Sequence, residues 1–239
     1  MRLAVFSDIH GNIQGLNAVL ADIERRGADL VWCGGDLVGY GANPGEVIDR
    51  IRALAIPTIM GNYDDGIGYF RIVCGCDYAT EEAAERGARS IAWTKAHTTE
   101  EQRAYLRNLP YRIQREIEGH QVVLVHGSPA RLNEYLYETV EEQVFAAHLD
   151  QTRTDVLLFG HTHKPFHKVV NGRHLVNTGS AGKPKHGNPN ATYVLLDLTP
   201  GAVHVEIIEV AYDFEAAARA VEATDLPHEF AHMLRQGRG

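Results

Sequence analysis

Carboxylate, imidazole and amide side chains recur directly after short apolar runs of this chain. Asp8 and His10 follow the run at 2–6, and Asp36 follows the run at 30–33. The other members of the set are Asn62 after 56–60, His126 after 121–125, and His161 and His163 after 155–159. Nitrogen and oxygen ligands without a thiolate suit a divalent transition metal such as Mn, Fe, Zn, Co or Ni.

Seven ligand groups exceed what one ion needs. If one carboxylate is shared, the seven divide into two sets. Two ions about 3.5–4 Å apart form a clamp that assists displacement at phosphorus. The residue types and their recurrence therefore predict a two-metal site that acts on phosphate esters. Each motif alone is weak evidence, and the prediction depends on finding all of them in order.

The apolar runs themselves predict buried strands, and the periodic segments between them predict helices. Leu16, Val19, Leu20 and Ile23 share one face of a helix at 13–26, and a second helix is predicted at 44–54. The order strand, helix, strand, helix, strand over residues 2–60 predicts parallel strands. In open α/β sheets ligands bind outside the carboxyl ends of the strands, so the seven residues can converge.

The remaining segments are predicted as follows. Further strands are expected at 112–117, 121–125, 155–159, 166–170, 173–177, 192–198 and 203–210, and helices at 139–149 and 213–223. Residues 66–110 are rich in Ala, Glu and Arg and predict a helical insertion, either a cover for the site or a solvated surface subdomain. The tail from Pro227 is polar and expected to be loose. We assign residues 1–239 to a single domain.

Composition excludes some classes of function. The chain of 239 residues has 23 Lys and Arg against 31 Asp and Glu, a net charge of −8, which argues against broad nucleic-acid binding. No apolar run is long enough to span a membrane, and the N-terminal run is too short for a signal peptide. Cys33, Cys74 and Cys76 are expected to be free thiols in a reducing compartment, with a Cys74-x-Cys76 metal site as the alternative. We expect a cytoplasmic protein and leave homo-oligomers open.

The motifs DIHGN, GGDLVGYG, GNYDD, VHGSP and GHTHKP, in this order, resemble those of the calcineurin-like metallophosphoesterases. The resemblance is greatest to their small bacterial and archaeal phosphodiesterase branch. It covers most of the chain apart from 66–110 and the tail, and the segment NTGSAGKP at 177–184 extends it. The resemblance implies an α/β fold, specifically a four-layer α/β/β/α sandwich of two mixed sheets flanked by helices.

The resemblance also implies how the ligands divide. One metal would be held by Asp8, His10, Asp36 and His163, and the other by Asp36, Asn62, His126 and His161, with Asp36 bridging. A hydroxide that bridges both ions would attack phosphorus in line. Manganese is the expected metal, with Fe, Zn, Ni and Co as alternatives.

Tyr63 departs from the family pattern. The position after Asn62 is commonly a histidine that can protonate the leaving group, whereas a free tyrosine has a pKa of about 10 and donates poorly near neutral pH. We therefore expect substrates whose leaving group needs little protonation, such as aryl phosphodiesters and nucleotide polyphosphates. Tyr63 could instead be a packing residue. Asp64 completes the catalytic candidates, which are Asp36, Asn62, Tyr63 and Asp64.

The substrate-binding candidates are Asn62, whose amide could reach the phosphate, Lys183 and Tyr40. Other pocket candidates are Lys185, Asn43, Asn133, Tyr135 and Tyr137. The first expectation is hydrolysis of a small phosphodiester. The alternatives are hydrolysis of nucleotide or diadenosine polyphosphates, and phosphomonoester hydrolysis. A different class of function, a non-catalytic interaction scaffold on the same fold, would have no reason to keep seven ligands.

Overall fold

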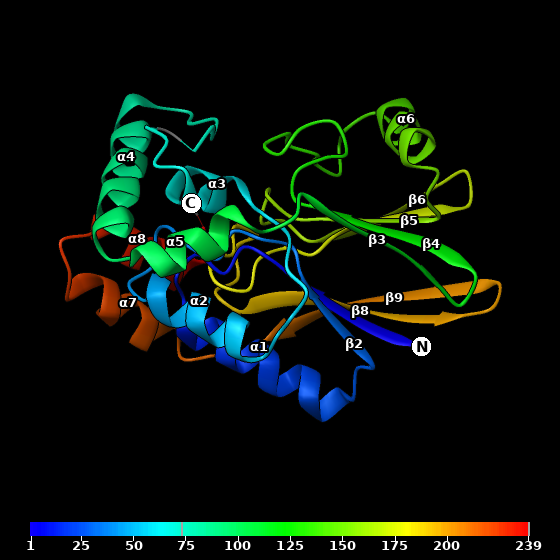
Figure 1. Cartoon of the computed structure of the whole chain (residues 1–239), viewed down its shortest axis with the longest axis horizontal. Helices are drawn as coiled ribbons and strands as arrows, with labels where there is room; N and C mark the ends of the chain where they lie inside the picture. Colours follow the sequence, from blue (N-terminus) through cyan, green and yellow to red (C-terminus); the bar gives the residue numbers. More distant parts are fainter. Residues whose placement is uncertain (73, 239) are drawn as a thin grey trace.

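The computed structural model describes residues 1–72 and 74–238, which form two mixed β-sheets stacked face to face (Figure 1). The first sheet has the order β2-β1-β8-β9, with β1 at Arg2–Phe6, β2 at Leu30–Cys33, β8 at Ala191–Thr199 and β9 at Ala202–Val210. Strands β1 and β2 are parallel, whereas β8 runs antiparallel to both β1 and β9. The prediction of a mixed sandwich is confirmed.

The second sheet has the order β3-β4-β5-β7-β6. Its strands are β3 at Arg112–Ile117, β4 at His120–Val125, β5 at Val156–Phe159, β6 at Phe166–Val170 and β7 at Arg173–Asn177. The parallel pairs β4–β5 and β5–β7 form its centre, and antiparallel hairpins close both edges. The carboxyl ends of the parallel strands β4 and β5 therefore lie at the same end of the sheet.

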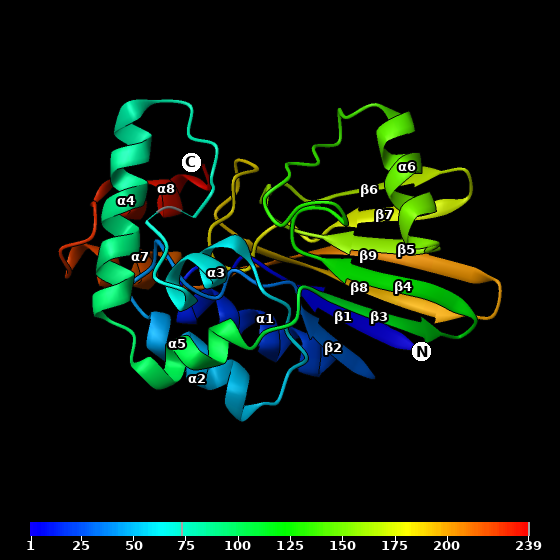
Figure 2. The same cartoon turned by 45° about the horizontal axis from the view of Figure 1, so that its top comes forward.

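Helices flank the two sheets on their outer faces and beyond one end of the strands (Figure 2). They are α1 at Ile13–Arg26, α2 at Pro44–Ala53, α3 at Asn62–Gly68, α4 at Glu81–Ala96, α5 at Glu100–Arg107, α6 at Glu142–Thr152, α7 at Phe214–Glu222 and α8 at Glu229–Gln236. Helices α1 and α2 lie on the side of the first sheet, and α6 covers the second. Within the described residues, no helix is both long enough and apolar enough to cross a membrane.

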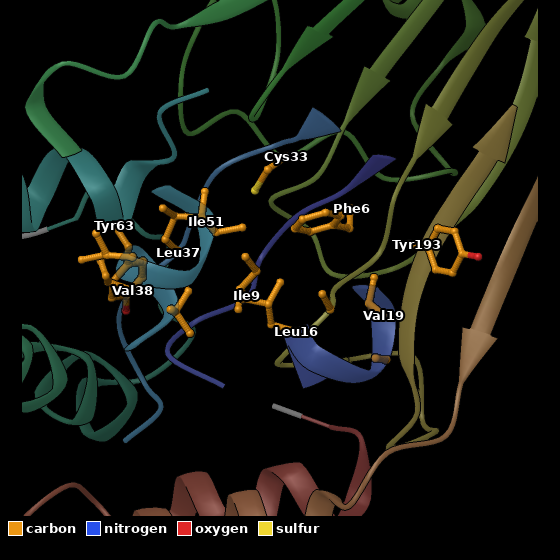
Figure 3. Packing of buried hydrophobic residues seen from close by; sticks show 14 of the residues in the cluster. Phe6, Ile9, Leu16, Val19, Cys33, Leu37, Val38, Ile51, Tyr63 and Tyr193 are labelled. Atoms are coloured by element: carbon orange, nitrogen blue, oxygen red, sulfur yellow. The ribbon is translucent and has the colours of Figure 1, made fainter. Parts of the chain in front are cut away.

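Alternation along the strands makes three apolar layers. In β1, Leu3 and Val5 pack between the two sheets, whereas Ala4 and Phe6 face the helical side. In β4, Val122 and Leu124 enter the same inter-sheet layer, and the intervening Val123 packs on the α6 side. Successive side chains of a strand point to opposite faces, so strands that are apolar on both faces can be covered on both. Figure 3 shows the helical side of the first sheet.

The predicted third strand at 56–60 is wrong. The segment makes only an isolated parallel bridge, in which Thr58 is paired with Cys33. Pro57 has no backbone N–H to donate, although its carbonyl accepts from the Cys33 N–H at 2.9 Å. The Met60 N–H then bonds to Pro110 outside the sheet, and the chain enters α3 at Asn62.

The prediction of a loose tail after Pro227 is also wrong. Residues 229–236 form α8, which packs with α7 in a small apolar cluster that includes Val221, Phe230 and Leu234. The helix was not predicted because the segment is mostly polar and its apolar stripe is only about two turns long. The ring of Phe230 lies 5.0 Å from that of Tyr40, so the tail reaches the loops that carry the candidate site.

Residues 66–110 contain the end of α3 and all of α4 and α5. Ile91 of α4 and Leu106 of α5 are buried in the same cluster as Leu37 and Ile48. We propose that the chain is one domain with these helices as an insertion, because their core is shared with the sheet layers rather than separate.

Candidate metal centre

The candidate site lies where loops leave the carboxyl ends of β1, β2, β4 and β5. Backbone hydrogen bonds fasten the first two loops to each other: Asp8 N–H to the Gly35 carbonyl at 2.9 Å and His10 N–H to the Asp36 carbonyl at 2.9 Å. Just beyond His10, the Asn12 side chain accepts from the Gly15 N–H at 2.9 Å and caps α1. The local turns thus aim the polar side chains between the two sheets.

Six of the seven predicted ligands form two compact groups. One consists of Asp8, His10 and His163, and the other of Asp36, His126 and His161. Within each group the candidate ligand atoms lie within 4.8 Å of one another, and every side chain is buried. The seventh, Asn62, joins the second group, because its Oδ1 lies 3.0 Å from His126 Nε2.

Backbone carbonyls orient three of the imidazole rings. The Nδ1 atoms lie 2.9 Å from the Val38 carbonyl in His10, 2.8 Å from the Gly34 carbonyl in His126, and 2.6 Å from the Lys183 carbonyl in His163. A carbonyl only accepts, so each Nδ1 carries the proton. In the neutral ring each Nε2 then presents a lone pair to the site, as a metal ligand must.

The Nε2 lone pairs face other hydrogen-bond acceptors, and this arrangement shows whether a cation would fit between them. His10 Nε2 lies 3.2 Å from His163 Nε2, and two unprotonated nitrogens cannot hydrogen-bond to each other. Within the described part of the chain, the buried atoms Asp8 Oδ1 and His161 Nε2 have no hydrogen-bond partner. Buried acceptors turned toward one another are costly without a shared donor or cation, so this donor set fits divalent metal ions.

Asp36 stands between the two groups. Its Oδ1 accepts from the Tyr63 N–H at 2.8 Å. Its Oδ2 lies 3.6 Å from His10 Nε2 in one group and 3.4 Å from His126 Nε2 in the other. The Tyr63 amide therefore fixes the carboxylate so that a single oxygen faces both groups.

Asp64 fixes this arrangement through the backbone. Its carboxylate accepts from the N–H groups of Asp36 at 2.8 Å, Leu37 at 2.9 Å and Gly61 at 2.9 Å. Burial and the neighbouring Asp36 charge raise the pKa of Asp64 to about 7. Both oxygens are committed to amide donors, so the geometry makes Asp64 a positioning residue for Asp36 rather than a group that meets substrate.

Burial sets the protonation state of most histidines in the site. It lowers the pKa of His10 and of His161 to about 3, and it lowers that of His163 well below the ordinary value. These rings are therefore neutral at pH 7. For His126 burial acts in the same direction, but the Asp36 carboxylate outweighs it and raises the pKa to about 10. A metal ion at that nitrogen would have to displace a proton.

On the sequence alone the Asn62 amide is expected to reach a substrate phosphate, but in the structure its nitrogen is turned toward the loop at 74–76. Its Nδ2 donates to the Cys74 carbonyl at 3.1 Å and lies 3.2 Å from Cys76 Sγ. The expectation of free thiols is also wrong for these two residues, because Cys74 and Cys76 are joined in a disulfide; Cys33 is free and buried. The loop at 74–76 brings the two sulfurs together, which a count of cysteines does not reveal.

Tyr63 is a buried residue at the centre of a tyrosine cluster. Its ring packs edge-on against His10 with 5.2 Å between centroids. Its hydroxyl lies 2.9 Å from that of Tyr78, which in turn lies 3.4 Å from the Tyr40 hydroxyl. Burial raises the pKa of Tyr63 well above its ordinary value. The hydroxyl therefore supports the site from behind, in agreement with the packing interpretation.

The substrate-binding candidates divide between two sides of the site. Lys183 is buried, with its ammonium 4.6 Å from the centroid of the half-buried Tyr40 ring. On the other side the Tyr135 ring lies 4.1 Å from that of His161. Asn133 bonds to the Gly75 carbonyl at 2.7 Å, beside this second group. Asn43 instead bonds to Glu46 at the start of α2.

Some residues that support the site were not singled out from the sequence. Ser7 hydrogen-bonds to the Asp8 carboxylate and to the Thr178 hydroxyl, and the Ser180 hydroxyl donates to the Asp8 carbonyl at 2.7 Å. Tyr78 anchors Tyr63. Ser7 precedes a predicted ligand directly, which was an available signal. The 74–78 loop offered none, because the contacts that tie it to the site, such as Tyr78 with Tyr63, join residues distant in sequence.

A hollow of about 1190 Å³ lies between α1 and α2 and contains none of the predicted ligands. The candidate metal ligands lie elsewhere, in the two buried groups at the carboxyl ends of the strands.

Comparisons with known proteins agree with this geometry. Residues 1–201 match the calcineurin-like phosphoesterase superfamily domain. The chain is 34% identical to an uncharacterized protein of Methanocaldococcus jannaschii, over 99% of this chain and 98% of that protein. It is 26% identical to the phosphodiesterase YfcE of Escherichia coli, over 82% of this chain and 88% of that protein.

The fold comparison gives the same result. A crystal structure of a metallophosphoesterase from Sphaerobacter thermophilus superposes with a TM-score of 0.79 at 28% identity, covering 99% of each chain. The match spans both sheets and the helices that cover them. The protein described here belongs to the calcineurin-like phosphoesterase superfamily.

Proposed function

We propose that this protein is a metal-dependent phosphoesterase that hydrolyses phosphodiesters at a site for two divalent ions. The observation that carries the proposal is the position of Asp36 Oδ2, which faces a histidine nitrogen in each ligand group, at 3.6 Å and 3.4 Å. One carboxylate oxygen shared by two groups is what a pair of closely spaced ions requires. The similarity to a named phosphodiesterase supports the diester preference.

The side chains have separate tasks in this proposal. Asp8, His10, Asp36 and His163 would hold one ion, and Asp36, Asn62, His126 and His161 the other. When bound, the ions supply a water of lowered pKa and neutralise phosphate charge. The carbonyls of Val38, Gly34 and Lys183 keep three histidine rings in the binding tautomer. We propose manganese as the native metal.

The leaving group receives little help from Tyr63. Its hydroxyl is bonded to Tyr78, and burial raises its pKa well above the ordinary value, so proton transfer from it near pH 7 is unfavourable. We therefore propose that the preferred substrates have leaving groups that depart as stable anions, namely aryl phosphodiesters and nucleotide polyphosphates.

The test compares two aryl esters after metal removal and restoration of Mn²⁺. We expect bis-p-nitrophenyl phosphate to be hydrolysed faster than p-nitrophenyl phosphate, with two metal ions bound per chain. Asp36→Ala should abolish turnover. Asp197→Asn is the matched control, because Asp197 is a partly exposed carboxylate that pairs with Arg2 far from the ligand groups.

Each other result changes the proposal in a defined way. Faster hydrolysis of the monoester would keep the metal site and make the protein a phosphatase. Two bound metals with no turnover of either ester or of diadenosine polyphosphates would favour an interaction scaffold. One metal per chain would contradict the bridging role of Asp36.

A further inference from the structure

A basic hollow lies beside the candidate metal centre, and none of the roles proposed above uses it. It has a volume of about 440 Å³ and is lined by Lys164, Lys185, His186, Gly187 and Arg238. The chain as a whole carries a net charge of −8. Three basic side chains gathered around one hollow therefore differ in sign from the average surface and would attract an anion locally.

The hollow is connected to the ligands through the backbone. Lys164 directly follows the ligand candidate His163, and the Lys185 N–H bonds to the His163 carbonyl at 3.4 Å. Neighbouring Cα atoms are about 3.8 Å apart, so the backbone of Lys164, which lines the hollow, lies next to that of a candidate metal ligand. The Gly187 N–H bonds to the Gly237 carbonyl at 2.9 Å, which brings in Arg238 from beyond α8.

The lysines and the arginine of the hollow lack acidic partners. Across residues 1–72 and 74–238, no carboxylate lies within 4 Å of the charged groups of Lys164, Lys185 or Arg238, whereas Arg235 in the preceding helix pairs with two glutamates. The carboxylate found at the hollow is that of Glu209, whose Oε1 lies 3.7 Å from His186 Nε2. In the same described range, neither ring nitrogen of His186 has a hydrogen-bond partner, although both are buried. Two lysines and an arginine without acidic partners around one space leave their positive charge available to an anionic ligand.

Aromatic rings extend from the metal centre to this hollow. The Tyr135 ring lies 4.1 Å from the His161 ring and stacks at 5.9 Å on Tyr137, which is 41% exposed. The Lys164 ammonium lies 5.6 Å from the centroid of the Tyr137 ring. An exposed tyrosine face offers a stacking surface for a nucleobase, since any base can pack on it.

We propose that this hollow binds a second phosphate group of the substrate, separate from the phosphate that is cleaved, and that the substrates are phosphodiesters of nucleotides. This inference rests on the function proposed above and narrows it. A phosphate monoester offers several oxygens to ammonium, guanidinium and imidazole donors at once, which a single carboxylate or a neutral group cannot match.

The first test is kinetic and uses two substrates that differ by one phosphate. The p-nitrophenyl ester of thymidine 5′-phosphate is compared with the same ester carrying an additional 3′-phosphate. We expect the second to have a kcat/KM about tenfold higher, mainly through a lower KM, which corresponds to about 1.4 kcal/mol. Lys164→Gln/Arg238→Gln, two exposed cations of the hollow that no catalytic or ligand role involves, should remove this preference and leave the rate on the simpler ester within about twofold.

The matched control is Arg112→Gln/Arg115→Gln. It removes the same charge from two exposed residues of β3, outside the hollow, and should keep the preference. Equal kcat/KM values for the two esters in the wild-type protein would overturn the proposal. So would the same loss of preference in the control, because the effect would then be one of net charge.

The second test needs no turnover. Calorimetric titration of the chelated protein with thymidine 3′,5′-bisphosphate should show binding that weakens at least about tenfold in Lys164→Gln/Arg238→Gln and not in the control. Such binding without hydrolysis of either ester would disprove the proposed catalytic function and keep the hollow as a phosphate site. Binding of inorganic phosphate with no preference between the esters would overturn the proposal, since the hollow would then serve the free ion.

Discussion

The two ends of the sheets use left-handed backbone conformations differently. At the end away from the site, the hairpin turns contain Gly119, Gly172 and Gly201, with φ of 82°, 74° and 79°. A Cβ added at any of these three positions would meet nothing within 4 Å. Glu118 and Asn171 share the conformation because a two-residue hairpin turn of this kind needs positive φ at both central positions.

At the site end, five of the left-handed positions are occupied by predicted ligands. The φ angles are 55° for Asp8, 49° for His10, 54° for Asp36, 64° for His161 and 58° for His163. For residues with a Cβ this conformation costs roughly 1–2 kcal/mol each. Glycine would remove the cost but also the side chain. The comparison shows that each far turn contains a glycine among its left-handed positions, whereas at the site five such positions carry the side chains that the ligand groups need.

Replacing one histidine at each end of the sheets should give the largest difference in metal content and activity. His163→Gln removes a ring that faces Asp8 and His10, so we expect the bound manganese to fall from two ions to one per chain. Since changes outside the ligand sphere already cost 10–100-fold, kcat/KM should fall by at least about 100-fold. Metal analysis and the aryl diester assay measure both effects.

The control for that replacement is His174→Gln on β7, near the far turns. It should leave metal content and turnover unchanged. Similar losses in the two variants would show that the site depends on general stability rather than on these ligands.

Adding a methyl group to glycines at the two ends should give the next effect. Gly172→Ala introduces strain alone and should lower the free energy of unfolding by about 1 kcal/mol. Gly35→Ala has φ of +85° and would also place its Cβ 2.5 Å from the Gly61 nitrogen, so a loss above about 3 kcal/mol is expected. Urea unfolding of the chelated proteins measures both. Equal losses would contradict the claim that the site loops are tightly interlocked.

Tyr63→Phe tests whether the residue beside the ligands supports the site or acts in the reaction. It removes the hydrogen bond to Tyr78, so we expect about 1 kcal/mol less stability and a change in kcat below about threefold. Thermal unfolding and the diester assay give the two values. A loss of about 100-fold in kcat at unchanged stability would instead make the tyrosine a proton donor.

The smallest effect concerns pH at the far end. Burial lowers the pKa values of His167 and His174, whose ring nitrogens lie 3.0 Å apart. With the folded pKa below the unfolded value of about 6.5, stability is present above that pH and is lost as pH falls through the folded pKa. Solvent screening keeps the effect below about 0.5 kcal/mol.

The measurement is unfolding between pH 7.5 and 5, compared with His167→Gln/His174→Gln. The variant should show the shallower decline. An unchanged slope would remove these two histidines from the pH dependence.

Local patterns in the chain predicted many of its elements. The helix at 13–26 was predicted with its observed bounds, because its apolar stripe and Gly27 are both local signals. The strand prediction at 56–60 failed because the pairing with β2 is limited to the single bridge of Thr58 with Cys33, and a short apolar run does not show how far such pairing extends. The prediction of a loose tail failed because the apolar stripe of α8 packs on α7, which the periodicity of so short a segment does not reveal.

What the sequence by itself determined is the inventory of ligand types and their placement after apolar runs. Both are local properties, and they were enough to predict an α/β chain with a metal site at the strand ends, whereas the sandwich of two mixed sheets was implied by the family resemblance of the motifs. Only the tertiary structure decided the rest: that β8 lies beside β1, that the Tyr63 hydroxyl turns to Tyr78, and that Lys164, Lys185 and Arg238 share one hollow. Such contacts join residues far apart in the chain, and their free energy depends on packing and burial that no single segment specifies.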